Sequence, residues 1–192
     1  MIYLSIDVEA SGPFPGLFSL VSIGAVPLLL SKRVWSVDHE HSFYQELRLL
    51  EGAAVMKKAM EIHKLSRAHL EENGLEAPEA MQRFETYFLE LKHRHRKITP
   101  AAWPSSFDAP YVGWYCQRFL GRNPLGWGAF DIPSYAMGLF RCNRQELRRA
   151  MKQAGIVEPA NSDPHNALAD AVQQGELLCR LLNYARSGPP PR

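Results

Sequence analysis

The chain of 192 residues is 46% hydrophobic and 22% charged, values typical of one globular domain that exclude wholesale disorder. A chain of this length can bury a full hydrophobic core without disulfide bonds or a structural metal. The formal net charge is only +2 and by itself indicates no polyanionic partner, although 15 of the 22 basic residues are arginine, which is well suited to phosphate contacts.

The first 46 residues carry the pattern of β-strands. Residues 2–9 alternate between apolar and polar side chains, which predicts a strand with one buried face. A turn rich in glycine and proline follows and leads to a second strand at about 17–29. A polar break at Ser31–Arg33 then indicates a hairpin into a third strand at about 34–46.

The remainder of the chain is mainly helical, with two further strands. Three consecutive strands followed by alternating strands and helices predict one α/β domain over 1–186, with a five-stranded mixed sheet flanked by helices. Residues 187–192 are expected to be a disordered tail. The expected strands lie near 97–103 and 126–130, and the expected helices near 53–64, 79–92, 107–120, 132–139, 143–154 and 165–186.

Asp7 and Glu9 form the first candidate functional pair. Because side chains at positions i and i+2 of a strand point the same way, the two carboxylates are expected to lie side by side. Adjacent anions on a buried strand repel each other unless a proton or a cation intervenes. The alternative is a strand end that reaches solvent, where both acids are hydrated.

A second candidate acid, Asp108, stands at the start of a predicted helix. It could act as the N-cap of that helix, with Pro110 tolerated in the first turn. It also shares a face with Val112 and Tyr115, at spacings of 4 and 7 residues. An acid at the head of an apolar stripe is expected to face the sheet rather than water.

The third candidate segment holds His165 and Asp170. Asp170 is in line with Ala167 and Gln174 in an inward-facing row, although it could also be a paired core acid or lie at the edge of a wide apolar face. His165 is five residues earlier and would lie about 140° away on a continuous helix. We therefore expect His165 in the loop or the first turn, from which its imidazole can lean over the site.

The four acids together predict a metal site. Hard cations such as Mg²⁺ and Mn²⁺ prefer carboxylate oxygens, and two such ions about 4 Å apart are a standard arrangement for attack on a phosphodiester. A neutral imidazole nearby can accept the proton of the attacking water. The expected metal ligands are Asp7, Glu9, Asp108 and Asp170, and the expected general base is His165.

Three segments resemble, in order, the motifs of the DEDDh 3′–5′ exonucleases, whose members include ribonuclease T, oligoribonuclease and the epsilon proofreading subunit of bacterial DNA polymerase III. IDVEASG is similar to D-x-E-x-x-G, SSFDAPYV to N-x-x-F-D, and HNALADA to H-x-A-L-x-D-A. The resemblance covers residues 1–182. It implies a ribonuclease H-like fold and a two-metal exonuclease acting on single-stranded 3′ ends, with the ligands and base named above.

The resemblance also implies where the substrate binds. In such enzymes the backbone after the first motif's glutamate holds the terminal nucleotide, and nearby phenylalanines could stack on bases, with a core position as the alternative. It further implies single-stranded RNA or DNA as the partner and a possible homodimer. The candidate substrate-binding residues are Ala10, Ser11, Gly12, Phe14 and Phe107, with Phe18, Met60 and His63 as further candidates.

The cysteines and the apolar runs indicate the compartment. Cys116, Cys142 and Cys179 are odd in number and widely spaced, so neither a disulfide framework nor a thiolate zinc site is expected. The N-terminus carries acids within its apolar run, unlike a signal peptide, and the apolar run Leu17–Leu30 is too short and too broken to cross a bilayer. We therefore expect a cytoplasmic protein without a membrane partner.

Other functions remain compatible with these residues. One is an oligoribonuclease-like hydrolase of very short RNAs or of small nucleotides, and another is a non-catalytic nucleic-acid-binding or polymerase-associated module. The presence of all five motif residues argues against the non-catalytic module. Setting aside the four acids raises the net charge of the remainder from +2 to +6, which favours a phosphate chain as partner. The basic segment 141–152 is the better candidate for tracking it, with a solvated helix face as the alternative.

Overall fold

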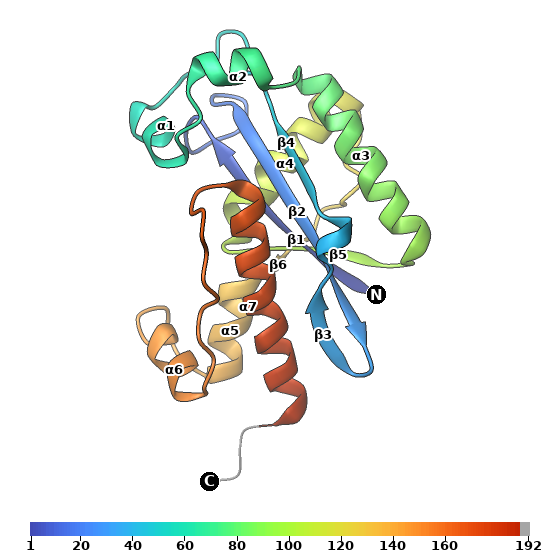
Figure 1. Ribbon diagram of the computed structural model, residues 1–192, viewed down its shortest axis with the longest axis vertical. Coiled ribbons are helices and arrows are strands. Elements are labelled where there is room, and N and C mark those ends of the chain that lie inside the picture. Colours follow the sequence, from blue (N-terminus) through green and yellow to red (C-terminus); the bar gives the residue numbers. More distant parts are fainter. Residues whose placement is uncertain (189–192) are drawn as a thin grey trace.

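The strand with the alternating pattern, β1, is the centre of a mixed sheet in the computed structural model, which describes residues 1–188 (Figure 1). β1 pairs antiparallel with β2 and parallel with β5. β6 extends the sheet beyond β5, and β3 and β4 both pair with the outer side of β2. The strands are β1 (Ile2–Ala10), β2 (Leu20–Ser31), β3 (Val34–Val37), β4 (Phe43–Glu46), β5 (Ile98–Ala102) and β6 (Phe130–Asp131).

The third predicted strand is interrupted, so the sheet has six strands where five were expected. A short 3₁₀ turn, His39–His41, separates β3 from β4. The backbone N–H of Asp38 donates to the carbonyl of Pro27, 2.9 Å away, so the backbone of Pro27 faces this turn. Because proline has no N–H, it cannot continue the ladder on that side. Pro27 therefore gives a physical reason for the division of the strand.

The helices follow the sequence pattern, with one addition. The additional helix is α2, which begins after its N-cap Ser66, whose hydroxyl accepts from the N–H of His69. Ser187 is the last residue of α7, and 189–192 of the expected tail lie outside the described residues. The helices are α1 (Lys57–His63), α2 (Arg67–Asn73), α3 (Ala77–Arg94), α4 (Ser105–Leu120), α5 (Ile132–Phe140), α6 (Leu147–Gln153) and α7 (Ala167–Ser187).

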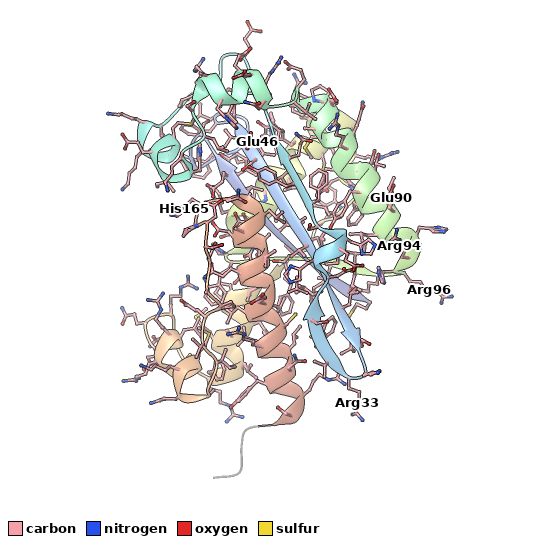
Figure 2. The ribbon with its side chains drawn as sticks, viewed as in Figure 1. Arg33, Glu46, Glu90, Arg94, Arg96 and His165 are labelled. Atoms are coloured by element: carbon pink, nitrogen blue, oxygen red, sulfur yellow. The ribbon has the colours of Figure 1, made fainter. Side chains whose placement is uncertain are left out.

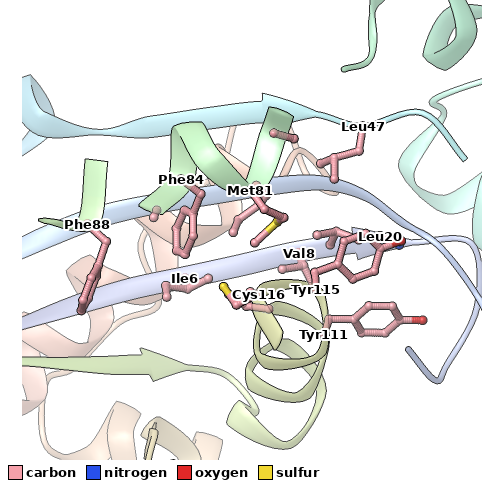
Figure 3. Packing of buried hydrophobic residues seen from close by; sticks show 14 of the residues in the cluster. Ile6, Val8, Leu20, Leu47, Met81, Phe84, Phe88, Tyr111, Tyr115 and Cys116 are labelled. Carbon is pink, nitrogen blue, oxygen red and sulfur yellow. The ribbon is translucent and has the colours of Figure 1, made fainter. Parts of the chain in front are cut away.

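The two faces of β1 pack against different helices. Ile6 and Val8 belong to a buried cluster with side chains of α3 and α4 (Figure 3). On the opposite face, the Ser5 hydroxyl donates to the carbonyl of Ala171 in α7, 2.7 Å away. α7 crosses the sheet on this side, with α5 and α6 beside its C-terminal half (Figure 1). The α/β fold class, with helices flanking a mixed sheet, is confirmed.

All three cysteines are free thiols within the described residues, as expected. Cys116 and Cys179 are buried, and burial raises the pKa of each thiol to about 12. No helix of the described chain has the length and apolar character needed to span a membrane.

Candidate active site

The site forms where the sheet splits. β1 and β5 pair only over Ile2–Ser5, so the C-terminal half of β1 has a free edge. Two side chains occupy this edge: the backbone N–H of Val8 donates to Asp108 Oδ1 at 2.9 Å, and Gln174 Nε2 donates to the carbonyl of Ile6 at 2.8 Å. α4 and α7 therefore each send one side chain to the free edge of β1, and these two side chains satisfy the N–H of Val8 and the carbonyl of Ile6.

Asp108 does not cap its helix. α4 begins at Ser105, so Asp108 lies within the first turn, and it is only 3% exposed. The N-cap interpretation is therefore wrong, and the expected inward orientation is correct. Asp131, by contrast, is the N-cap of α5: it accepts from the N–H of Ser134 at 2.9 Å. Its other oxygen accepts from the N–H of Ser105, which joins the start of α4 to the end of β6.

His165 lies in the loop before α7 and not in the helix. Asn166 is the N-cap, and its side chain accepts from the first N–H groups of α7. The backbone N–H of His165 donates to Asp170 Oδ2 at 3.0 Å, and Asn161 donates to Oδ1 of the same carboxylate. His165 is exposed and has a φ of 67°, an unfavourable conformation for a residue with a side chain. The loop is thus held against Asp170 from two directions.

Gly24 sets how closely α7 approaches the sheet. It pairs with Asp7 in the β1–β2 ladder. A Cβ atom at Gly24 would lie 2.3 Å from the backbone of Ala167, a distance that does not occur in proteins. The absence of a side chain therefore allows the first turn of α7, which carries Asp170, to lie directly on β2 beside Asp7.

Burial raises the pKa of all four acids, and neighbouring carboxylates add to the shift. Burial is the first cause at Asp7 and lifts its pKa well above the usual range, with further contributions from Asp108, Glu9 and Asp170. Burial also raises the pKa of Glu9 to about 8, with Asp170 and Asp108 adding to it. Burial also raises the pKa of Asp108, and this effect is larger than the lowering caused by the hydrogen bond from the N–H of Val8. The strand-end interpretation, with fully hydrated acids, is therefore wrong.

This donor set fits a divalent cation. Ligand atoms of Glu9, His165 and Asp170 all lie within 4.8 Å of one another. After burial, Asp108 and Asp170 are further causes that raise the pKa of both Asp7 and Glu9, so these acids are close enough to interact. A cation removes the repulsion that raises these pKa values, because it favours the charged form of each carboxylate. The acidic cluster can therefore hold metal with oxygen ligands, the chemistry that Mg²⁺ and Mn²⁺ prefer.

The loop after Glu9 is tied to its neighbours by Ser11. The Ser11 hydroxyl donates to the carbonyl of Ala54 and accepts from the N–H of Ser19, both within 2.9 Å. Its backbone carbonyl accepts from the N–H of Met56. Gly12 is in contact with the buried ring of Phe18, so Phe18 is a core aromatic. The polar groups of Ser11 thus shape the loop, and Ala10, also buried, ends β1.

The candidate phenylalanines differ in exposure. Phe14 is 66% exposed on the loop after Gly12. Phe107 is half-buried and packs on Tyr111, with 5.2 Å between ring centroids. Tyr111 in turn donates its hydroxyl hydrogen to the carbonyl of Gly12. Of the two candidates, Phe14 therefore offers a free ring face, and Phe107 supports the loop through Tyr111.

Three residues of the site were not singled out by sequence reasoning for a role there. Gln174 was placed only in an inward-facing row, Asn161 supports Asp170, and Trp103 lines one cleft with Asp7 and His165. Trp103 stands directly after β5. Sequence alone gave no reason to assign a role to it or to Asn161, because an aromatic residue at the end of a strand and a polar residue in a loop before a helix are both common. Contacts with partners distant in sequence, rather than local pattern, bring Gln174 and Trp103 to the site, while Asn161 is held there by Asp170 and Gln173.

His63, a low-ranked candidate, is close enough to His165 to be affected by it. It is 5% exposed, and burial lowers its pKa, with His165 as a second cause. Its Nδ1 accepts from the N–H of Leu65, and its Nε2 has no partner among the described residues. A second basic segment, residues 92–97 at the end of α3, is remote from the site, because Figure 2 shows Arg94 and Arg96 across the molecule from His165.

A ribonuclease H-like fold with a cluster of carboxylates at the end of its central strand defines a class of metal-dependent nucleases. The chain is 31% identical over 182 residues to the 3′–5′ DNA exonuclease Cap18 of Escherichia coli, covering 95% of this chain and 91% of that protein. It is 27% identical over 183 residues to ribonuclease T of Yersinia pseudotuberculosis, covering 93% and 83% respectively. No protein-family model matches the chain.

Solved structures share the fold. The nuclease domain of 3′hExo, a DEDDh family member bound to rAMP, superimposes with a TM-score of 0.74 at 14% identity, covering 98% of this chain and 93% of that one. Together with the identity to Cap18, this answers the question of family: the chain belongs to the DEDDh 3′–5′ exonucleases. It is therefore an enzyme, an exonuclease that hydrolyses phosphodiester bonds in nucleic acid.

Proposed function

We propose that this exonuclease removes nucleotides from single-stranded 3′ ends with two divalent ions, Mg²⁺ or Mn²⁺, held by Asp7, Glu9, Asp108 and Asp170. The observation that carries the proposal is the convergence of these carboxylates at the free edge of β1, where Asp108 binds the N–H of Val8 and Glu9 and Asp170 offer ligand atoms within 4.8 Å of each other. After burial, Asp108 and Asp170 are further causes that raise the pKa of both Asp7 and Glu9. When bound, such ions supply Lewis acidity toward water and the departing oxygen. The protein's part is to fix the carboxylates, through Val8 for Asp108 and through Asn161 and His165 for Asp170.

We infer that His165 is the general base. Its backbone is bound to Asp170 while its imidazole is exposed and near Glu9, so the ring can accept a proton from water at the acidic cluster. Burial lowers the pKa of nearby His63, with His165 as a second cause, and this favours the neutral form of the His63 imidazole.

We assign the 3′-terminal nucleotide to the loop after Glu9. The backbone of Ala10, Ser11 and Gly12 forms the wall beside the acids, and the exposed ring of Phe14 is suited to stack on a base. Phe107 supports this wall through Tyr111.

DNA is the substrate we propose first. The relative with 31% identity is named as a DNA exonuclease, and the relative with 27% identity is named for RNA. The chain is compatible with a homodimer and with a cytoplasmic location, which its free cysteines suit. These two points rest on sequence reasoning alone and stay predictions.

The test uses 5′-labelled single-stranded DNA and RNA of one sequence, incubated with the protein and Mg²⁺ or Mn²⁺. A descending ladder that is absent with chelator, and forms faster on DNA, is the expected result. A ladder on RNA alone would overturn the DNA proposal, and products released from the 5′ end, or cleavage confined to dinucleotides, would overturn the proposed substrate end or length. A ladder that persists with chelator would overturn the proposed metal site.

A further inference from the structure

Trp103 and Arg144 form a stacked pair at the border of the acidic cleft. The guanidinium carbon of Arg144 lies over the indole, 5.3 Å from the ring centroid. At this distance a cation is attracted to the face of the ring. Trp103 lines the same cleft as Asp7 and His165. The guanidinium is therefore held against a ring that lines the cleft of Asp7 and His165.

Arg144 has no acidic partner in the part of the chain that the structure describes. Its side chain makes neither a hydrogen bond nor an ion pair with residues 1–188, although Glu158 and Asp170 line the cleft. Glu158 is paired with Arg148 instead, at 3.4 Å. An exposed guanidinium that is oriented by an aromatic ring and keeps its N–H donors free is suited to bidentate binding of phosphate.

The turn that carries Arg144 is held by its own hydrogen bonds. Asn143 Oδ1 accepts from the N–H groups of Gln145 and Glu146, at 3.0 and 3.1 Å. In return the Glu146 carboxylate accepts from the N–H of Asn143 at 3.2 Å. This reciprocal pattern is that of a capping box, and it fixes the backbone on both sides of Arg144. Less conformational entropy is therefore lost when Arg144 binds a ligand.

Trp103 lies on the opposite side of β1 from the loop after Glu9. Ser11 in that loop is bonded to Ser19, next to the start of β2, whereas Trp103 directly follows β5. β1 separates β2 from β5 in the sheet. A scissile phosphodiester has a nucleoside on each side, so a strand that enters this site needs binding groups on both sides of the acids. The cleft lined by Trp103 has a volume of about 330 Å³, within the range of small-ligand sites.

We propose that Trp103 and Arg144 form a second nucleotide subsite, in which Arg144 binds the phosphate on the 5′ side of the scissile one. Trp103 is a positioning residue that holds the guanidinium over the cleft. The inference rests on the proposed function, in which the loop after Glu9 holds the 3′-terminal nucleotide. The subsite therefore receives the penultimate nucleotide and selects chains over single nucleotides.

The experiment measures KM of the wild type and of the Arg144→Ala variant for two substrates. One is a single-stranded oligonucleotide, and the other is the p-nitrophenyl ester of thymidine 5′-monophosphate, which has only one nucleoside. The ratio of KM for the oligonucleotide to KM for the ester is expected to rise about tenfold. The slope of log KM against log salt for the oligonucleotide should fall in magnitude by about 0.7, the effect of one lost phosphate contact. Trp103→Ala should produce both changes as well. Trp103→Phe should stay close to the wild type in both measurements, because it keeps an aromatic ring beneath the guanidinium.

Arg83→Ala is the matched control, because it removes one positive charge on α3, where Arg83 is paired with Glu79. It should leave both the KM ratio and the salt slope at the wild-type values. If Arg144→Ala also leaves them there while the wild type cleaves both substrates, the subsite is overturned and the exonuclease proposal stands. If the wild type cleaves neither substrate with Mg²⁺ or Mn²⁺, both proposals fail.

Discussion

Asp170 accepts a hydrogen bond from the backbone N–H of His165, 3.0 Å away, and this bond leaves the His165 imidazole free. The support of the carboxylate and the chemistry of the ring therefore reside in different atoms of one residue. A substitution of the side chain removes the ring and keeps the N–H that holds Asp170. The two roles can be separated by experiment.

The first prediction concerns His165→Ala. The variant should lose about 10²- to 10⁴-fold in kcat, the range for removal of a general base, while its affinity for Mn²⁺ stays within a few-fold of the wild type. Single-turnover kinetics and calorimetric titration with Mn²⁺ measure the two quantities. His93→Ala, an exposed histidine on α3, is the control. A variant with the full rate across pH 6–9 would show that His165 is not the base.

The second prediction concerns Asp7→Asn. Activity and metal affinity should fall, by at least about a hundredfold in rate. The metal-free protein should become more stable by about 1 kcal/mol, or about 2–4 °C in Tm, because one of four repelling carboxylates is neutral. Thermal unfolding with EDTA and with Mn²⁺ measures this directly. A lower Tm in EDTA would contradict the assigned repulsion.

The third prediction is a pH dependence of stability without metal. Burial raises the pKa of Glu9 in the folded protein to about 8, against an ordinary value of 4.5, so the folded state binds the additional proton between these values. The resulting stability is complete below about pH 4.5 and is lost as the pH rises through about 8. Urea unfolding in EDTA from pH 5 to 8.5 should show this fall.

Glu9→Gln isolates this contribution. The lowered pKa of His63 acts in the opposite direction, because that imidazole gains a proton more readily when the chain unfolds. Both proteins contain His63, so its contribution cancels in the difference between their free energies of unfolding. This difference should become smaller when Mn²⁺ is added. A pH-independent difference between the two proteins in EDTA would show that the carboxyl of Glu9 is not perturbed.

The fourth prediction concerns Gly24→Ala. A methyl group there would overlap the backbone of Ala167, so α7 must shift, with a loss of about 3 kcal/mol in the free energy of unfolding and a lower rate. Gly138→Ala is the control, since Gly138 is exposed in α5 with no atom within 4 Å of an added Cβ. The control should gain about 0.5–1 kcal/mol in chemical unfolding. Equal stability of the two variants would contradict the close approach.

The parts of the fold that depend on local periodicity could be predicted from the sequence. The alternation in 2–9 predicted β1, and the spacing of Asp7 and Glu9 predicted two carboxylates on one face. The five-residue offset from Asp170 predicted that His165 stands outside the helix. In each case the relevant geometry is a property of a single strand or helix.

The features that were missed depend on partners distant in sequence. Pro27 interrupts a neighbouring strand because its missing N–H faces that strand, and sequence alone does not say which side it faces. Trp103 and Arg144 meet only after β5 and the turn before α6 are placed together. Gln174 is an ordinary inward-facing residue until β1 is found to have an open edge.

The open edge of β1 has a consequence for how the molecule behaves in a crowded solution. A strand with unsatisfied N–H and C=O groups is a template on which another chain can add a strand, and self-association of this kind leads to aggregates. Asp108 and Gln174 occupy the N–H of Val8 and the carbonyl of Ile6, so the opening that admits substrate offers no ladder to a foreign strand. The two side chains that occupy this edge of the candidate site are therefore also expected to disfavour aggregation through β1.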